Sequence, residues 1–556
     1  MNITREDLIR TASEIFGWDT PREGQLEAMA AVAQGRDVLC VMPTGHGKSA
    51  VYQVPAFTLP GIAVVISPLI ALQRDQADGI NAAAGATRAY VLNSSQPQSS
   101  IDAAWAAAED RNEDTRAKFL FLAPEQLARQ EVSDRLKGLD VSILVIDEAH
   151  CVSTWGHDFR PDYLQLGGLA QALGRPVVAL TATAAPPVRA EIAEVLQLKD
   201  PFLIAQGFDR PNLHLAVHMH VEAEDKRRAV MQSVTELTHP GLVYVATRKE
   251  TEQYAADLAM AGLRTAPYHS GRPAGERKEV HQQFLDDQLD VVVATTAFGM
   301  GIDKPNVRYV VHAGIPDSID SYYQEIGRGG RDGLPSAAVL HYRPEDLGLR
   351  RFFASKRPDE GSLRQLLAAL RAERGPIKQA QLAQLAQKLG VSGRRLSGLL
   401  NLLQEAGAVS MSKRGYKARK MAPNDAVAAA MDYAERRENI DQSRVDMARQ
   451  YAETSGCRRQ FLLGYFGEEL PEPCGNCDNC DRAAAEGEAV EDAAPSTGEM
   501  EDPFPLQSAV THAEWGPGVV MSYENDTVTV LFESTGYKTL SVELVVEKGL
   551  LEPLNR

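Results

Sequence analysis

The sequence has 556 residues, of which 44% are hydrophobic, a formal net charge of −17 and a pI near 5.3. This length and apolar content predict a soluble multidomain protein with three to five packed domains. The N-terminus lacks the basic-then-apolar build of a secretory signal, and no apolar run is long enough to span a bilayer. We therefore expect no membrane partner and a cytoplasmic, nucleoid-associated protein.

The negative charge is unevenly distributed along the chain. Residues 376–420 hold nine Lys or Arg against a single acid, Glu405. A basic face inside an acidic chain can still bind nucleic acid, so the net charge argues only weakly against DNA binding.

Short apolar strands alternate with helical stretches twice along the chain, and each series predicts a parallel sheet covered by helices. The first lobe, residues 1–205, has predicted strands at 37–42, 63–67, 119–122, 141–146 and 177–180. The second lobe, residues 206–350, has predicted strands at 242–246, 291–294 and 309–312. Two such lobes stacked together create a cleft between them.

The remaining chain is divided by changes in composition. Residues 360–422 show a helix, a tight turn, a second helix and a basic hairpin, the order of a winged helix, with a small helical linker as the alternative. Residues 423–482 predict a helical zinc-binding domain. Residues 483–505 predict a disordered acidic linker, and residues 506–556 a small five-stranded β-barrel.

The basic hairpin is predicted to be the wing that contacts duplex DNA. Its cations would bind phosphates, and Tyr416 would be available to stack at a fork. The predicted DNA contacts of this region are Arg394, Arg395, Lys413, Arg414, Tyr416 and Lys417.

A phosphate-binding loop is predicted at residues 42–49, between a strand and a helix. Backbone N–H groups and the helix N-terminus bind phosphates there, Lys48 reaches the terminal phosphates, and the Ser49 hydroxyl ligates magnesium. Met42 stands where the full consensus has its first glycine, but the strand-loop-helix context is right. The predicted nucleotide contacts of the loop are Thr44, Gly45, His46, Gly47, Lys48 and Ser49.

Two adjacent carboxylates, Asp147 and Glu148, follow the apolar strand 141–146. A parallel sheet delivers such acids to its ligand crevice. There, Asp147 would hold magnesium through water, and Glu148 would orient or deprotonate the attacking water. Because Asp-Glu after an apolar run is common by chance, its partners elsewhere in the chain decide the interpretation.

The loop behind these acids mixes aromatic and basic side chains, which suits stacking on bases and contact with phosphates. Simple packing is the alternative for aromatics in a loop. The predicted DNA contacts are Trp155, His157, Phe159 and Arg160, with Tyr163 as a further aromatic.

The second lobe supplies a third motif, Gln-Glu-Ile-Gly-Arg-Gly-Gly-Arg, at residues 324–331. Its two arginines can reach across the cleft to the γ-phosphate, one of them as an arginine finger that stabilises transition-state charge. The three motifs in this order indicate ATP hydrolysis. The predicted catalytic set is Lys48, Asp147, Glu148, His150, Gln324, Arg328 and Arg331.

With these motifs the sequence resembles the superfamily-two DNA helicases of the RecQ type, over about residues 3–347 and again over 457–480. The aromatic-rich loop is the most diagnostic of the shared motifs. The others are Phe16-Gly17-Trp18 with Arg22 and Gln25, residues 67–72 (Ser-Pro-Leu-Ile-Ala-Leu), 147–150 (Asp-Glu-Ala-His), 181–183 (Thr-Ala-Thr), 208–212 (Phe-Asp-Arg-Pro-Asn) and 299–303 (Gly-Met-Gly-Ile-Asp).

The resemblance implies two tandem RecA-like lobes and translocation in the 3′-to-5′ direction along one DNA strand. It implies that Trp18 and Arg22 pack against adenine and that Gln25 hydrogen-bonds it. Gly301 and Asp303 would contact the nucleotide from the second lobe, and Arg331 would be the finger. In the family, the winged helix follows the zinc segment, whereas here it precedes it, and Pro21 replaces the usual aromatic.

Four of the six cysteines cluster as C-x16-C-x2-C-x2-C. In a reducing compartment two C-x2-C steps indicate a closed, structural zinc site rather than disulfides, with an iron–sulfur cluster on the same ligands as the alternative. Cys40 and Cys151 are expected to be core thiols. The predicted zinc ligands are Cys457, Cys474, Cys477 and Cys480.

The terminal module, residues 506–556, resembles in residues 512–519 the Tudor-like domains that end some superfamily-one repair helicases of the UvrD/PcrA type. That resemblance implies a protein partner, RNA polymerase or a repair factor. The alternative is a structural cap packed on the helicase. The acidic linker favours a mobile module that recruits its partner.

The predicted function is an ATP-dependent DNA helicase in repair or recombination that uses ATP, magnesium and zinc and acts on single-stranded and forked DNA. One alternative is a translocase that acts on RNA or remodels nucleic-acid complexes without processive unwinding. The other is a winged-helix DNA-binding regulator with ATP as a switch. DNA-stimulated ATPase with strand separation would eliminate the regulator, and comparing duplex DNA with duplex RNA would separate the helicase from the translocase.

Overall fold

The computed structural model describes most of the chain between residues 3 and 554. Among the predicted site residues, Thr44, Trp155, His157, Phe159, Gly301, Asp303, Lys413 and Arg414 lie outside the described residues, as does the side chain of Arg394. The residues not described within that span are 23, 44, 94–95, 154–159, 161–162, 164, 206, 299–303, 355–357, 374, 379–380, 413–414, 488–502 and 525.

The first lobe is built on a seven-stranded parallel sheet in the order β3-β4-β2-β5-β6-β1-β7. Its central strands are almost entirely apolar, with Ser142 of the strand at 141–146 as an exception, because helices cover both faces. The strands are β1 (Val38–Val41), β2 (Ile62–Ile66), β3 (Ala89–Leu92), β4 (Phe119–Leu122), β5 (Val141–Ile146), β6 (Val177–Thr181) and β7 (Phe202–Ala205).

Among the described residues of lobe 1, eight α-helices accompany this sheet. The first begins with a capping box, in which Thr4 accepts a hydrogen bond from the Asp7 N–H and the Asp7 carboxylate accepts one from the Thr4 N–H. The helices are α1 (Arg5–Phe16), α2 (Gln25–Ala33), α3 (Ala50–Thr58), α4 (Ile70–Ala84), α5 (Gln98–Glu109), α6 (Gln130–Gly138), α7 (Leu166–Leu173) and α8 (Pro186–Val195).

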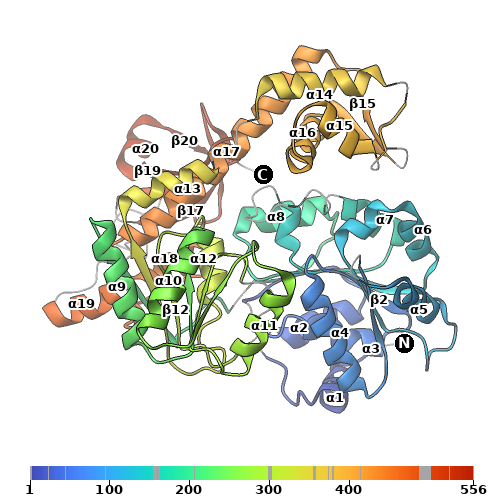
Figure 1. Ribbon diagram of the computed structural model, residues 1–556, viewed down its shortest axis with the longest axis horizontal. Helices are drawn as coiled ribbons and strands as arrows, with labels where there is room; N and C mark the ends of the chain where they lie inside the picture. The colour runs from blue at the N-terminus through green and yellow to red at the C-terminus, as the bar shows by residue number, and fades with distance from the viewer. Residues whose placement is uncertain are drawn as a thin grey trace.

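The second lobe repeats the design with a six-stranded parallel sheet in the order β10-β11-β9-β12-β13-β8. The two lobes lie side by side, lobe 1 in blue to teal and lobe 2 in green (Figure 1). Its elements are β8 (Leu213–Met219), α9 (Ala223–Glu236), β9 (Gly241–Tyr244), α10 (Arg248–Met260), β10 (Thr265–Tyr268), α11 (Ala274–Leu285), β11 (Val291–Ala294), β12 (Tyr309–His312), α12 (Ile319–Ile326) and β13 (Ser336–Tyr342).

All eight predicted strands are confirmed, and the structure adds five more. Four of the five, β3, β7, β8 and β10, are the edge strands of the two sheets, and the fifth, β13, is next to an edge. Edge strands carry less continuous apolar sequence because one side faces solvent. Prediction of strands from short apolar runs therefore finds the central strands of each sheet and misses the strands at or next to its edges.

A helical region follows lobe 2 and contains the expected helix-turn-helix and hairpin. The hairpin is extended by an antiparallel bridge between Ile377 and Tyr416. The elements are α13 (Leu347–Ala354), α14 (Glu360–Ala372), α15 (Leu382–Lys388), α16 (Gly393–Glu405), β14 (Val409–Ser412) and β15 (Gly415–Ala418).

The 31-residue helix α17 (Pro423–Glu453) joins this region to the rest of the molecule. Near its start, Val427 belongs to the core of the helix-turn-helix region, and near its end Tyr451 belongs to the main core shared with lobe 2. In Figure 1 the region of α14, α15 and α16 accordingly lies at one end of α17, above lobe 1. Helices α18 (Arg458–Tyr465) and α19 (Asp478–Glu486) follow.

The chain ends in a five-stranded antiparallel sheet in the order β19-β18-β17-β16-β20, so β19 and β20 form its two edges. Its elements are β16 (Ala509–His512), β17 (Gly516–Glu524), β18 (Thr527–Phe532), β19 (Gly536–Ser541), α20 (Val542–Lys548) and β20 (Leu551–Pro553).

This terminal module is packed on α17 and α18. Tyr537 lies with its ring centroid 5.6 Å from that of Tyr465, and both belong to the main core. Gln450 donates to the Thr539 hydroxyl at 3.1 Å, and a Cβ at Gly536 would lie 2.1 Å from Ser443 Oγ. The expectation of a freely moving module is therefore wrong, and the alternative of a cap packed on the helicase describes its position.

The predicted linker 483–505 also needs correction at both ends. Residues 483–486 continue α19, and Phe504 is buried in the core of the terminal module. Composition alone did not show this, because Ala and Glu also favour helix. Residues 488–502 lie outside the part of the chain that is described.

Candidate nucleotide site and cysteine cluster

The predicted phosphate-binding loop connects β1 to α3. Gly45 and Gly47 have φ values of +86° and +75°, a left-handed conformation that side chains rarely adopt. Lys48 Nζ donates to the Met42 carbonyl at 2.9 Å, so the side chain folds back over its own loop. Ser49 is the residue before α3, and its Oγ accepts from Gln76 at 3.4 Å.

The three predicted adenine-contact residues lie close in sequence, and two of them contact this loop. Arg22 Nη1 donates to the Gly45 carbonyl at 2.8 Å. Gln25 Nε2 donates to the carbonyls of His46 at 2.8 Å and Gly47 at 3.2 Å. Trp18 is 39% exposed and stacks on Phe16, with ring centroids 4.5 Å apart, which leaves one face of the indole for another planar group.

Asp147 lies where the carboxyl ends of β5 and β2 meet. The two strands pair in register at Ile66 and Ile146, so Ser67 and Asp147 are neighbours, and the Ser67 hydroxyl donates to Asp147 Oδ2 at 3.1 Å. Asp147 as a whole residue is only 7% exposed. Burial raises the pKa of Asp147, and the nearby Lys48 opposes the rise; burial likewise lowers the pKa of Lys48. The pocket therefore contains opposite charges in a poorly hydrated place.

Glu148 has φ +50° and ψ +48°, a left-handed conformation that is unusual for a residue other than glycine. Such strain is concentrated at functional sites, where the surrounding structure holds it. Glu148 Oε2 lies 3.3 Å from His150 Nδ1, which is also 2.9 Å from the Thr181 hydroxyl at the end of β6. The strained turn directs Glu148 toward His150 instead of along the strand.

Lobe 2 reaches the phosphate-binding loop through Arg331. A Cβ at Gly45 would lie 3.5 Å from Arg331 Cδ and 3.7 Å from its Nε. Gln324 contacts lobe 1 as well, since its Nε2 donates to the Thr183 hydroxyl at 3.2 Å. These two contacts bring Arg331 and Gln324, both members of the predicted catalytic set, to lobe 1.

Arg328 remains within lobe 2, although the sequence predicted that both arginines could cross the cleft. It is 6% exposed and lies beside Tyr244 of β9, whose pKa is raised to about 12 by burial while Arg328 opposes the rise. Two glycines separate the two arginines, and their side chains diverge: within the described part of the phosphate-binding loop, Arg331 lies against Gly45, whereas Arg328 lies beside Tyr244.

Several residues of this site were not among the predicted site residues. Ser67, Thr181 and Thr183 end or follow buried strands, and polar residues at strand ends were the available signal. Arg210 donates to the carbonyls of three glycines in the 327–330 loop. No local pattern could have indicated that contact, because more than one hundred residues separate the partners.

The predicted DNA contacts are only partly described. Arg160 donates its backbone N–H to the Cys151 carbonyl at 2.9 Å. Tyr163 is fully buried, with its hydroxyl donating to the Asp147 carbonyl at 3.1 Å, so it is a core residue and not a base-stacking one. Arg395 and Lys417 are exposed. Tyr416 is partly buried against the core of its region, so its ring is less available for stacking than predicted.

The four clustered cysteines come together as expected. Their Sγ atoms all lie within 4.8 Å of one another, a group that could hold a metal ion. Cys457 directly precedes α18 and Cys477 directly precedes α19, so helix starts position two of the ligands. Cys40 and Cys151 are buried free thiols, as predicted.

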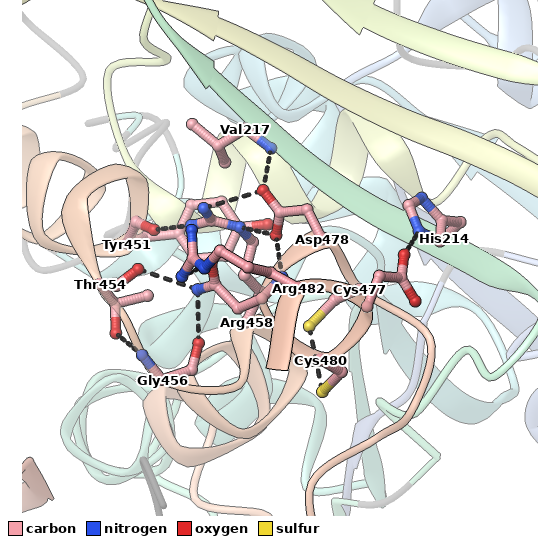
Figure 2. A network of polar contacts seen from close by, with 12 residues as sticks. His214, Val217, Tyr451, Thr454, Gly456, Arg458, Cys477, Asp478, Cys480 and Arg482 are labelled. Atoms are coloured by element: carbon pink, nitrogen blue, oxygen red, sulfur yellow. Dashed lines mark hydrogen bonds and ion pairs between the residues drawn. The ribbon is translucent and has the colours of Figure 1, made fainter. Parts of the chain in front are cut away.

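Polar contacts of residues next to the four cysteines connect this cluster to β8, the edge strand of the lobe 2 sheet. Asp478 accepts from Arg458 at 2.5 and 3.0 Å and from the Val217 N–H of β8 at 2.9 Å (Figure 2). His214 Nε2 lies 2.8 Å from Asp481, and an isolated bridge pairs Leu215 with Cys477. The cluster thus covers the edge strand β8, which would otherwise expose unpaired backbone.

No helix among the described residues has both the length and the apolar content needed to cross a membrane. The fold and the site together define a class of protein, the two-lobed P-loop proteins whose nucleotide site lies between two parallel-sheet lobes.

Comparison with known proteins narrows this class. Residues 22–191 match the family DEAD/DEAH box helicase, residues 225–333 the helicase conserved C-terminal domain, and residues 416–481 the RecQ zinc-binding family. A variant of Dbp5 of Saccharomyces cerevisiae bound to RNA and ADP BeF3 is similar in fold, with a TM-score of 0.50 and 17% identity, over 62% of this chain and 90% of that one.

Two relatives from Bacillus subtilis show the family. The protein named "Probable ATP-dependent DNA helicase RecS" is 39% identical over 62% of this chain and 68% of its own length. The ATP-dependent DNA helicase RecQ is 36% identical over 84% of this chain, and the match spans 65% of that relative's length. The chain belongs to the RecQ family of ATP-dependent DNA helicases.

Proposed function

We propose that this protein is an ATP-dependent DNA helicase that moves 3′-to-5′ along one strand and separates duplexes during DNA repair or recombination. The observation that carries the proposal is the approach of Arg331 in lobe 2 to Gly45 in the phosphate-binding loop of lobe 1. A nucleotide bound at that loop would be contacted from both lobes, so its hydrolysis would change the position of one lobe relative to the other. Membership of the RecQ family supports the same activity.

The hydrolytic roles follow from the positions of the side chains. Backbone N–H groups of residues 45–49 and Lys48 would bind the ATP phosphates. Ser49 and Asp147 are suited to hold magnesium, whose positive charge would neutralise charge on the phosphates. Glu148 would orient and deprotonate the attacking water, with His150 holding the Glu148 carboxylate. Arg331 would stabilise the charge that develops on the γ-phosphate.

The four cysteines would hold a structural zinc ion. A closed set of four thiolates with helix starts beside two of them fits the tetrahedral preference of zinc. Asp478 and Asp481 contact Val217 and His214 of β8. The metal would therefore stabilise the packing of the segment after α18 against the edge of lobe 2. We therefore assign the ion a structural and not a catalytic role.

The proposed nucleic-acid substrates are single-stranded and forked DNA. In the sequence, residues 154–160 are separated from Glu148 only by residues 149–153, so we propose that a strand bound there alters the position of that carboxylate. The helix-turn-helix region with its hairpin is proposed to be a winged helix that contacts the duplex. We still propose that the terminal module binds a protein partner, RNA polymerase or a repair factor. It would do so while packed on α17 and α18, and not as a mobile module.

The unwinding proposal is tested with purified protein on forked DNA and on forked RNA of the same sequence. ATP-dependent separation of DNA but not of RNA supports it. Separation of RNA alone, or ATPase without strand separation, would favour the translocase alternative. DNA binding without any ATPase would favour the regulator.

Replacement of Glu148 by glutamine should lower kcat for ATP hydrolysis by about 10²–10⁴-fold, the usual contribution of a general base. Single-stranded DNA binding should persist, because Glu148 faces the nucleotide pocket. Steady-state hydrolysis and fluorescence anisotropy measure the two quantities. Glu125→Gln, an exposed carboxylate of lobe 1, is the matched control. An unchanged kcat in Glu148→Gln would remove Glu148 from the mechanism.

Replacement of both Arg395 and Lys417 by alanine should weaken forked-duplex binding and reduce the slope of log K against log salt by roughly two, about one for each lost phosphate contact. Both side chains are exposed on the proposed winged helix. Titrations at several salt concentrations test this. The double variant Arg10→Ala with Arg228→Ala, on the two lobes, is the control. An unchanged slope in the Arg395 and Lys417 variant would show that this face does not meet DNA.

A further inference from the structure

A three-residue turn at the end of α18, residues 466–468, packs against and hydrogen-bonds the segment that joins the two lobes. Phe208 lies in that segment, between β7 and β8. Its N–H donates to Glu468 Oε2 at 2.9 Å, and its carbonyl accepts from the Tyr323 hydroxyl at 2.6 Å. Its ring stacks on Phe466 with centroids 4.9 Å apart and planes 3° apart. Both backbone groups and the side chain of one residue are therefore held.

The same turn is attached to lobe 1. Arg189 of α8 donates to the Phe466 carbonyl at 2.6 Å and to the Ala184 carbonyl at 2.8 Å. Gly467 has φ +76°, and a Cβ there would lie 3.2 Å from Pro186. Burial lowers the pKa of Arg189 to about 10, with Glu468 opposing the shift. The turn thus contacts lobe 1, the joining segment and, through Tyr323, lobe 2.

From Phe208 the contacts continue to the arginine-bearing loop. Arg210, two residues further on, donates to the carbonyls of Gly327 at 3.2 Å, Gly329 at 2.8 Å and Gly330 at 3.1 Å. Arg331 follows directly and lies against Gly45. A glycine-rich loop has little stiffness of its own, so the Arg210 guanidinium helps to fix its path. Asn212, which donates to the Gly330 carbonyl at 2.8 Å, and the backbone hydrogen bond from Gly330 to Val307 at 2.8 Å hold the same loop.

We propose that Glu468, together with Phe466, is a positioning residue for Arg331. By holding the backbone of Phe208, the end of α18 sets where Arg210 lies, and Arg210 sets the loop that carries the finger. The region that carries the cysteine cluster would then contribute to the rate of ATP hydrolysis from outside the nucleotide site. The inference rests on the proposed ATP hydrolysis and adds residues that no catalytic motif contains.

Loss of the Glu468 contact should act on the transition state and not on nucleotide binding. A displacement of the finger by about 1 Å can cost on the order of 10²-fold in rate. Glu468→Ala is therefore expected to lower kcat by about 10–100-fold with KM for ATP within about twofold of wild type, because the P-loop, Arg22 and Gln25 are all in lobe 1. Affinity for ADP with aluminium fluoride should fall by the same factor, while affinity for ADP alone stays the same.

Two further variants separate positioning from folding. Glu468→Gln keeps an acceptor for the Phe208 N–H and should recover most of kcat, whereas the exposed neighbour Glu469→Ala should match wild type. Melting temperature and zinc content are measured for each. If Glu468→Ala does not fold, Glu468→Asp, which withdraws the acceptor by one methylene, takes its place.

A double-mutant cycle with Arg331→Ala is the decisive measurement. If Glu468 acts through the finger, adding Glu468→Ala to Arg331→Ala should lower kcat by less than about twofold. Full additivity of the two losses, or an equal loss of ADP affinity in Glu468→Ala, would overturn the inference. A wild-type protein without ATPase would instead defeat the proposed function, and the two failures are thus distinguishable.

Discussion

Replacement of Arg331 by alanine is expected to lower kcat for DNA-stimulated ATP hydrolysis by about 10³–10⁵-fold, the range found for arginine fingers. Arg331 approaches Gly45 from the opposite lobe, so it is placed to meet the γ-phosphate of an ATP bound at that loop. Stabilisation confined to the transition state appears in kcat and not in KM. Steady-state hydrolysis at saturating single-stranded DNA, with KM measured separately, tests the expectation.

Two variants sharpen this experiment. Arg331→Lys keeps the charge but loses the planar fork, so it should recover only part of the loss. Arg228→Ala removes an exposed arginine of lobe 2 and should have no effect. A rise in KM with kcat unchanged would mean that Arg331 binds ATP in its ground state. Arg331 would then not be the finger.

Replacement of Cys477 by serine is expected to remove the metal and to unfold the region from α18 to α19. Apparent binding free energies of structural zinc in small peptides are about 10–16 kcal/mol, and that energy is folding energy when the site does not exist in the unfolded chain. Cys477 lies at the start of α19, and its loss would also release the contacts of Asp478 and Asp481 with β8. Metal analysis and thermal melting measure both effects.

Cys40→Ala is the matched control for this variant. It removes a buried thiol of lobe 1 that is far from the cluster in sequence, so the protein should keep one metal per chain. A wild-type protein that contains no zinc would contradict the assignment. Iron with visible absorption would instead identify an iron–sulfur cluster on the same four thiolates.

The nucleotide motifs and the cysteine cluster show which features of the structure a local sequence pattern can predict. The phosphate-binding loop, the acids after β5 and the cysteine spacing are each local patterns, and the structure places all three as expected. Their geometry depends on neighbours within a few residues and on the ends of buried strands. The strain at Glu148 and the role of Ser67 were not predicted, because they depend on how β2 and β5 align in the sheet.

Most contacts between distant parts of the chain were decided by the tertiary structure alone. The motif predicted that Arg331 would cross the cleft but not that it would lie against Gly45. The hydrogen bond from Phe208 to Glu468, which joins residues 260 positions apart, was not predicted at all. The glycine-rich loop also directs its two arginines to different places, although the sequence treats them alike. Such contacts depend on complementary surfaces, which neither periodicity nor spacing encodes.

The sequence by itself determined the family, the two lobes, their central strands, the candidate nucleotide residues and the cysteine cluster, because each of these has a local pattern of apolar or chemically specific residues. The tertiary structure alone decided the edge strands, the divergence of Arg328 from Arg331 and the docking of the terminal module. An acidic linker permits a module to move, but the packing of Tyr537 on Tyr465 buries apolar surface and holds it in place.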